Sequence, residues 1–265
     1  MAHNVKIKNF TIGENHPPFI VAEMSGNHNQ SIEKALEIVE EVAKSGAHAI
    51  KLQTYTADTL TIDKKDGDFY LGDKNSLWNG MSMYELYQQA HTPWDWHKQI
   101  FERCNQLDLL CFSTPFDETA VDFLETLNCP CYKIASTENT DFELLKKVAT
   151  TGKPVIISTG MATVEELGQI VSVVTKAGCA DLILLKCTAA YPASPSDANL
   201  ATIQHMKDLL GCQIGISDHT LGIGVAVASI ALGAAMVEKH FTMSRQDGGV
   251  DASFSMEPHE FKLMV

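Results

Sequence analysis

Residues 155–187 read VIISTGMATVEELGQIVSVVTKAGCADLILLKC, and this stretch holds one complete strand–helix–strand unit. Two apolar runs rich in branched side chains, 155–158 and 182–187, flank a segment in which apolar residues recur at helical spacing. The helix has start and stop signals, because Thr163 and Glu166 stand at capping-box spacing and Gly178 follows its end. This order of elements indicates a βαβ unit with parallel strands.

The same unit recurs along nearly the whole chain. Ser31 is the expected cap of the first helix, and Thr140 with Glu143 has capping-box spacing in a helix that ends before Gly152. Eight strands, each followed by a helix, predict an α/β protein of the (β/α)8 TIM-barrel class, which 265 residues can form. A doubly wound open sheet is the alternative, but eight units and the lack of a glycine fingerprint after the first strand disfavour it. The predicted strands are 19–24, 49–54, 109–113, 132–135, 155–158, 182–187, 213–217 and 236–241.

The alternation is interrupted between residues 55 and 93. This insertion follows the second strand, on the side of a barrel where active sites form, so it is predicted to be a substrate lid. The alternative is an insertion that packs only on its own aromatic residues. Residues 1–265 are expected to form a single catalytic barrel, and the chain stops in the opening of the eighth helix, as if cut.

Charge and composition exclude several classes of partner. The chain has 20 Lys and Arg against 33 Asp and Glu, a net charge of −13, which disfavours nucleic acid and anionic membrane surfaces. Residues 220–237 carry no charge, but their glycines and flanking polar residues favour a buried helix and strand over a membrane span. Seven cysteines without a paired CxxC array indicate reduced thiols, and a start without an apolar signal core is consistent with a cytoplasmic protein.

Polar residues stand at one end of strands that should be apolar throughout. Buried parallel strands normally read as continuous apolar runs, so this repeated departure predicts one polar pocket at the carboxyl end of the barrel. The polar groups, strand by strand, are Glu23, Ser25, Asn27 and His28; Lys51 and Gln53; Ser113 and Thr114; Lys133 and Ser136; Ser158 and Thr159; Lys186 and Thr188; Ser217 and His219; Glu238 and His240.

The residue types in this pocket suit two kinds of ligand. The cationic, donor-rich part favours phosphate or carboxylate, and consists of Lys51, Lys133, Thr114, Ser136, Ser158 and Ser217. Alternatively, each lysine pairs with a barrel carboxylate such as Glu23 or Glu238. His219 and His240 come from adjacent strands and could meet at one divalent cation, although core or hydrogen-bonded histidines are the ordinary alternative.

Seven of these strand-end motifs, in order, resemble the sialic acid synthase family. They are Glu23-Met-Ser-Gly-Asn-His-Asn29, Lys51-Leu-Gln-Thr54, Ser113-Thr-Pro-Phe116, Tyr132-Lys-Ile-Ala-Ser136, Ser158-Thr-Gly-Met161, Ser217-Asp-His-Thr220 and Glu238-Lys-His-Phe241. Within the family, 77–80, 84–87 and 186–188 resemble the pseudaminic branch. Sialic acid synthases proper have Asn after the Cys-Thr pair, where this chain has Ala189.

The resemblance implies a fold, a reaction and partners. The family has a (β/α)8 barrel followed by a small antifreeze-like domain, which is absent from this chain and caps the partner's site in a homodimer. Its reaction condenses phosphoenolpyruvate with an N-acetylated amino-sugar aldehyde, which here would be 2,4-diacetamido-2,4,6-trideoxy-L-altrose, giving pseudaminic acid and phosphate. No nucleic acid or membrane partner is implied.

The resemblance also implies roles for individual residues. The expected metal ligands are His219 and His240, which would hold Mn2+ or Mg2+. Glu23 is the candidate for proton transfer or water positioning, and the catalytic set is Glu23, Lys51, Lys133 and His219. Substrate-binding roles fall to Lys51, Gln53, Thr114, Lys133, Ser136, Ser158, Tyr191, Ser217 and Asp251.

Three alternative functions remain open at this point. The first is the same chemistry on another sugar, giving N-acetylneuraminic or legionaminic acid. The second is a Schiff-base aldolase, since Lys186 lies on a barrel strand and a desolvated lysine can act as a nucleophile. The third is a barrel that binds sugar or phosphate without catalysis.

Overall fold

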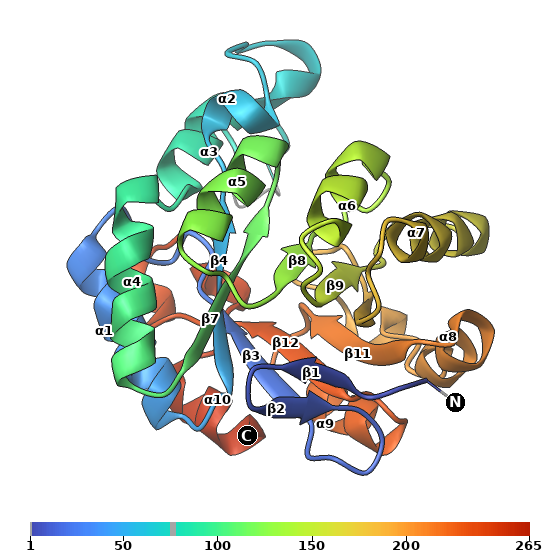
Figure 1. Ribbon diagram of the computed structural model, residues 1–265. Coiled ribbons are helices and arrows are strands. Elements are labelled where there is room, and N and C mark those ends of the chain that lie inside the picture. The colour runs from blue at the N-terminus through green and yellow to red at the C-terminus, as the bar shows by residue number, and fades with distance from the viewer. Residues whose placement is uncertain (1, 75–77) are drawn as a thin grey trace.

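The computed structural model describes residues 2–74 and 78–265, and eight parallel strands in it form a closed barrel (Figure 1). The predicted (β/α)8 barrel is confirmed, and no bound of a predicted strand is off by more than two residues. Around the barrel the strand order is β10-β11-β12-β3-β4-β7-β8-β9. The strands are β3 (Phe19–Glu23), β4 (Ala49–Thr54), β7 (Leu110–Pro115), β8 (Tyr132–Ile134), β9 (Val155–Ser158), β10 (Leu182–Cys187), β11 (Gln213–Asp218) and β12 (Met236–His240).

A helix follows each barrel strand and packs on the outside of the barrel. The predicted caps at Ser31 and Thr163 are confirmed, since each hydroxyl accepts a backbone N–H of its helix. The prediction at Thr140 is wrong: the Asp141 carboxylate accepts the Leu144 N–H at 3.0 Å and caps that helix instead. The helices are α1 (Ile32–Lys44), α4 (Trp94–Gln106), α5 (Glu118–Thr126), α6 (Phe142–Ala149), α7 (Val164–Lys176), α8 (Thr202–Leu210), α9 (Gly224–Ala231) and α10 (Pro258–Met264).

An antiparallel hairpin that the sequence did not reveal, β1 (Val5–Ile7) and β2 (Phe10–Ile12), lies at the amino end of the barrel. Val5, Ile7 and Ile12 are fully buried, and the partly buried Phe10 ring packs edge-on against Phe19, the first residue of β3, at 5.1 Å. The hairpin therefore closes one end of the barrel, and the opposite, carboxyl end is left for the site.

The segment between residues 55 and 93 stands at this carboxyl end (Figure 1, top). It contains α2 (Ala57–Leu60), the 3-10 helix η1 (Gly67–Phe69), the strand pair β5 (Tyr70–Leu71) and β6 (Met81–Ser82), and α3 (Met83–Ala90). The Tyr84 hydroxyl donates to the Asp58 carboxylate at 3.0 Å and joins α3 to α2. In the described ranges 55–74 and 78–93 the segment is thus folded into helices and a strand pair, and is not a structureless loop.

Three further 3-10 helices lie in loops at the same end: η2 (Pro195–Asp197), η3 (Arg245–Asp247) and η4 (Ala252–Phe254). The uncharged residues 220–237 form α9 and the beginning of β12, as predicted. Across the described ranges, no helix combines the length and apolar character needed to cross a membrane. All seven cysteines are free thiols.

Candidate active site

Strand register determines which side chains face the barrel interior. Ser217 lies beside both Cys187 and Glu238 in the register, and Glu23 lies beside both His240 and Lys51. Neighbours across parallel strands share a face, and alternate residues along a strand do so too, so all of these side chains point inward. Lys186 precedes Cys187 and points the opposite way, toward the helices.

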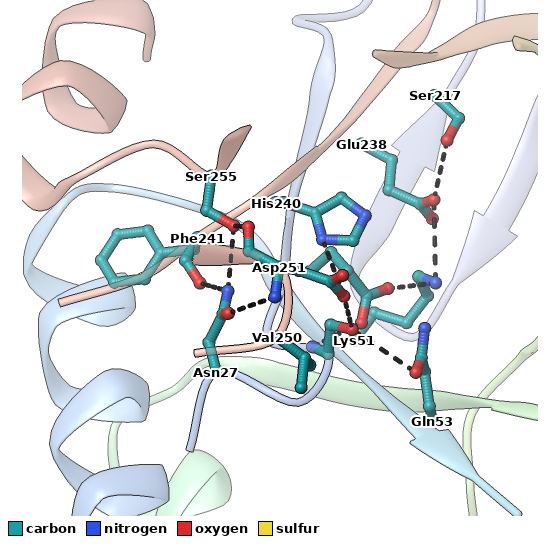
Figure 2. A network of polar contacts seen from close by, with 12 residues as sticks. Asn27, Lys51, Gln53, Ser217, Glu238, His240, Phe241, Val250, Asp251 and Ser255 are labelled. Carbon is teal, nitrogen blue, oxygen red and sulfur yellow. Dashed lines mark hydrogen bonds and ion pairs between the residues drawn. The ribbon is translucent and has the colours of Figure 1, made fainter. Parts of the chain in front are cut away.

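Two lysines and two glutamates form a buried cluster in the interior, of which Figure 2 labels Lys51 and Glu238. The Lys51 ammonium contacts the Glu23 carboxylate and lies 3.7 Å from Glu238 Oε1, and the Lys133 Nζ lies 3.4 Å from the same Glu238 oxygen. Each of the four residues is at most 4% exposed. The alternative that the lysines pair with Glu23 and Glu238 is therefore what the structure shows, and any anion that binds here meets a charge-balanced cluster.

Hydroxyl groups surround the cluster. Lys51 Nζ donates to Thr114 Oγ1 at 3.2 Å, Lys133 Nζ donates to Ser158 Oγ at 2.7 Å, and Ser217 Oγ donates to Glu238 Oε1 at 3.1 Å. Ser136 Oγ accepts the Gly160 N–H at 3.1 Å, and a Cβ at Gly160 would lie only 2.7 Å from this oxygen. The cationic and hydroxyl residues predicted to gather do so, at one end of the barrel.

Burial perturbs the charges of the cluster. It raises the pKa of Glu23, although the neighbouring Lys51 acts in the opposite direction. Burial also opposes ionisation of Glu238, but Lys133 and Lys51 outweigh it and the pKa of this carboxyl is lowered. For Lys133, burial dominates and lowers the pKa. Of the two carboxyls, Glu23 is therefore the one poised to take up a proton.

His219 and His240 lie side by side next to the cluster, with ring centroids 5.4 Å apart. His219 Nδ1 donates to the Thr188 carbonyl at 3.0 Å, whereas His240 Nδ1 is buried without a hydrogen-bond partner. Burial opposes protonation of His219, but its hydrogen bonds with the Cys187 thiol and the Thr188 carbonyl outweigh it and raise its pKa. Burial holds the pKa of His240 well below its usual value, so this imidazole is neutral, as a metal ligand must be.

The donor set fits an open metal site with two protein ligands. Among residues 2–74 and 78–265, no group of three or more His, Cys, Asp or Glu side chains is arranged to hold a metal ion. Any cation held by the two imidazoles would need water or substrate oxygens to complete its shell. A buried ion pair next to the histidines, Asp218 Oδ2 with Lys239 Nζ at 2.7 Å, joins the ends of β11 and β12 that carry them.

Gln53, Tyr191 and Asp251 are the side chains predicted to contact the sugar. Together with His240 they line a cavity of about 430 Å³. The Ser25 hydroxyl donates to Asp251 and lies 3.5 Å from Gln53 Oε1. Asn27 holds the loop that carries Asp251, since its amide donates to the Phe241 carbonyl at 2.8 Å and accepts the Asp251 N–H (Figure 2). Tyr191 is 42% exposed and its ring centroid lies 4.3 Å from that of His219.

The sequence analysis gave several residues of this site no role in substrate binding or catalysis. Glu238 was considered only as a structural partner, yet it stands two residues before His240 on one strand and therefore on the same face. Ser25 bridges to Asp251, and the Cys187 thiol, whose pKa is lowered by its hydrogen bond with His219 in spite of burial, faces the same interior. Strand alternation could have revealed the part played by Glu238 and Cys187, whereas the bond from Ser25 to Asp251 joins residues 226 positions apart and has no local signal.

Fold and site together define a (β/α)8-barrel protein whose pocket joins a lysine–carboxylate cluster to a pair of imidazoles. Residues 38–265 match the sequence profile of the NeuB family, and the chain belongs to that family. The resemblance to the sialic acid synthase family is thereby confirmed.

Named relatives and solved structures agree with this assignment. A pseudaminic acid synthase of Helicobacter pylori is 44% identical over 94% of this chain and 73% of its own length. An N,N'-diacetyllegionaminic acid synthase of Campylobacter jejuni is 35% identical over 92% of this chain and 73% of its own. The crystal structure of an N-acetylneuraminic acid synthetase from Leptospira borgpetersenii superposes with a TM-score of 0.90 at 32% identity, covering 100% of this chain and 87% of that one.

Proposed function

We propose that this protein is a pseudaminic acid synthase, which condenses phosphoenolpyruvate with 2,4-diacetamido-2,4,6-trideoxy-L-altrose to give pseudaminic acid and phosphate. The similarity to the Helicobacter pylori pseudaminic acid synthase over 94% of the chain supports the reaction. The observation that carries it within the structure is the lysine–hydroxyl cluster beside two imidazoles, at the carboxyl end of one barrel.

Phosphoenolpyruvate binds at the cluster. Its phosphate and carboxylate accept hydrogen bonds from Lys51, Lys133 and the hydroxyls of Thr114, Ser136, Ser158 and Ser217. Because Glu23 and Glu238 already balance the two lysines, the incoming anion adds negative charge to a buried site. Protonation of Glu23, whose pKa is already raised by burial, relieves that excess.

His219 and His240 would hold a divalent metal, Mn2+ or Mg2+, and the lowered pKa of His240 keeps that imidazole in the neutral form that a ligand needs. The metal, when bound, supplies Lewis-acid polarisation of the sugar aldehyde. The His240 nitrogen that lacks a hydrogen-bond partner supports this assignment, because a buried polar atom without a partner is costly unless a ligand satisfies it.

In the reaction, C3 of phosphoenolpyruvate adds to the aldehyde carbon and cationic character develops at C2. Water adds to C2, and the resulting tetrahedral centre loses phosphate by cleavage of its C–O bond. Glu23 positions this water or transfers its proton. Gln53, Tyr191 and Asp251 bind the sugar, and the Ser25 hydroxyl orients the Asp251 carboxylate.

The alternatives differ in how well the geometry supports them. N-acetylneuraminic or legionaminic acid synthesis uses the same cluster and the same imidazoles, so only the sugar pocket separates it from the proposal. The Schiff-base aldolase loses its support, since Lys186 faces outward and donates to Thr188 Oγ1 at 2.7 Å instead of entering the barrel.

The proposed role is consistent with a cytoplasmic location. A cytoplasmic protein has direct access to phosphoenolpyruvate, and the seven free thiols are compatible with that compartment. We also propose that the full-length protein is a homodimer, in which an antifreeze-like domain after the barrel caps the partner's site and the 55–93 segment acts as a lid.

Phosphate release tests the function. The protein is incubated with phosphoenolpyruvate and each candidate amino sugar, with and without manganese, and phosphate is measured. We expect metal-dependent release that is fastest with the diacetamido-trideoxy sugar. No release with any of the sugars, by a full-length protein in the presence of metal, would contradict the proposal.

A further inference from the structure

Both apolar and polar residues line the cavity of about 430 Å³. A single segment, 55–93, contributes six of its lining residues: Tyr55, Leu60, Trp78, Leu86, Tyr87 and Ala90. Phe116 and Val250 extend this surface from neighbouring loops. We call these eight residues the apolar wall. The polar residues Ser25, Gln53, His240 and Asp251 line the same cavity, so a bound sugar meets both kinds of surface.

The apolar wall is assembled by contacts between segments far apart in the chain. The Trp78 indole Nε1 donates to the Val250 carbonyl at 2.9 Å and ties the insertion to the loop that carries Asp251. The Tyr55 ring packs edge-on against Phe116 at 5.1 Å and against Tyr87 at 5.9 Å. The wall is therefore a held surface with a defined shape.

Close packing at Gly26 holds the same arrangement. A Cβ at Gly26 would lie 2.5 Å from a Val250 methyl and 2.9 Å from the Ala90 carbonyl oxygen. The loop after β3, the end of α3 and the Val250 loop therefore meet at a point where no side chain fits. Gly26 therefore lies where the wall meets the loop that carries Asp251, the residue next to Val250.

Such a surface discriminates between sugars by the substituents that face it. A sugar hydroxyl pressed against apolar side chains gives up its hydrogen bonds to water without replacement, which weakens binding. Burial of a deoxy methyl or an acetyl methyl against the same side chains instead strengthens binding. Fully hydroxylated amino sugars are therefore penalised at this wall, and deoxygenated, acylated ones are favoured.

We propose that the apolar wall is the specificity-determining element of the pocket, selecting a 6-deoxy, doubly acylated hexose over a hydroxylated one such as N-acetyl-D-mannosamine. This inference rests on the proposed function, because it concerns the sugar partner of that reaction. In the bound sugar the aldehyde end faces His240 and Asp251, and the methyl groups face Leu60, Val250 and their neighbours. Selection then arises at a segment that takes no part in phosphoenolpyruvate binding.

Two substitutions test the wall by making it polar, and in each the new side chain is similar in shape to the one it replaces. They are Leu60→Asn, on the half-buried end of α2, and Val250→Thr, which preserves the branched shape that Gly26 requires. Ile62→Asn is the matched control, because Ile62 lies in the same segment, is 59% exposed and does not line the cavity. Thermal unfolding checks that each variant is folded.

The measured quantity is kcat/KM for 2,4-diacetamido-2,4,6-trideoxy-L-altrose divided by that for N-acetyl-D-mannosamine. This ratio should exceed one in the wild type and fall by about tenfold in each wall variant, a difference typical of one mispaired hydroxyl or methyl group. The ratio should be unchanged in Ile62→Asn, and the KM for phosphoenolpyruvate should be unchanged in all three variants.

The outcomes separate this inference from the proposed function. Unchanged ratios in folded Leu60→Asn and Val250→Thr, or an equal fall in Ile62→Asn, would overturn the role of the wall while leaving the synthase reaction intact. A wild type that prefers N-acetyl-D-mannosamine would also overturn it. If the barrel alone does not turn over, calorimetric dissociation constants for the same two sugars replace kcat/KM, and the same comparisons decide.

Discussion

Replacing Lys51 by methionine is expected to separate the structural role of this lysine from its role in phosphoenolpyruvate binding. Lys51 is 4% exposed, and its ammonium contacts Glu23 and lies 3.7 Å from Glu238. Methionine keeps the length of the side chain but leaves two buried carboxylates to share Lys133. Breaking a buried ion pair typically costs about 3–5 kcal/mol. In a chain of this size the Tm should fall by roughly 6–20 °C.

The affinity for phosphoenolpyruvate should fall as well, for a different reason. A charge-assisted hydrogen bond contributes about 1.5–3 kcal/mol, so its loss corresponds to roughly a 10- to 150-fold increase in Kd. The double variant Lys51→Met with Glu23→Gln removes both charges and leaves Lys133 paired with Glu238. We expect it to regain most of the lost stability and none of the lost affinity.

Thermal unfolding and calorimetric titration of phosphoenolpyruvate measure the two effects separately. The destabilisation by Lys51→Met should also depend on pH. Burial raises the pKa of Glu23, so the folded state holds more protons than the unfolded chain above pH 4.5 and stability falls as pH rises through the folded-state pKa. Without Lys51 this loss is larger. A Tm equal to that of the wild type, or full affinity in the double variant, would refute the reasoning.

The remaining predictions concern the two metal-binding histidines, the uptake of a proton by Glu23, and Lys186, whose side chain faces outward. His219→Ala and His240→Ala should each abolish manganese binding, measured by electron paramagnetic resonance, and metal-dependent turnover, while the Tm stays within a few degrees; undiminished binding would remove that histidine from the site. Phosphoenolpyruvate binding near neutral pH should take up a proton, detected by calorimetry in buffers of different ionisation enthalpy, and Glu23→Gln should abolish the uptake. Borohydride treatment with pyruvate should leave Lys186 unmodified by mass spectrometry, because its side chain faces away from the barrel interior; a stable adduct there would restore the aldolase.

Hydrophobic periodicity was enough to predict the barrel and the bounds of its strands. Parallel strands are apolar on both faces, so each interruption by a polar residue, such as Lys133 or Ser217, marked the end where the pocket lies. The direction of Lys186 was also within reach of the sequence, since it alternates with Cys187 on one strand. The amino-terminal hairpin was missed because two strands of three residues carry too little periodic signal.

The sequence by itself therefore determined the architecture, the family and the end of the barrel that carries the chemistry, because these depend on local patterns and on ordered motifs. Only the tertiary structure decided that Lys51 and Lys133 are neutralised by Glu23 and Glu238, and that the eight residues of the apolar wall line one cavity. Both features arise from contacts between distant residues, such as the bond from Trp78 to Val250 across 172 positions. Local propensity carries no information about such pairings, since side-chain packing in the closed barrel is what selects them.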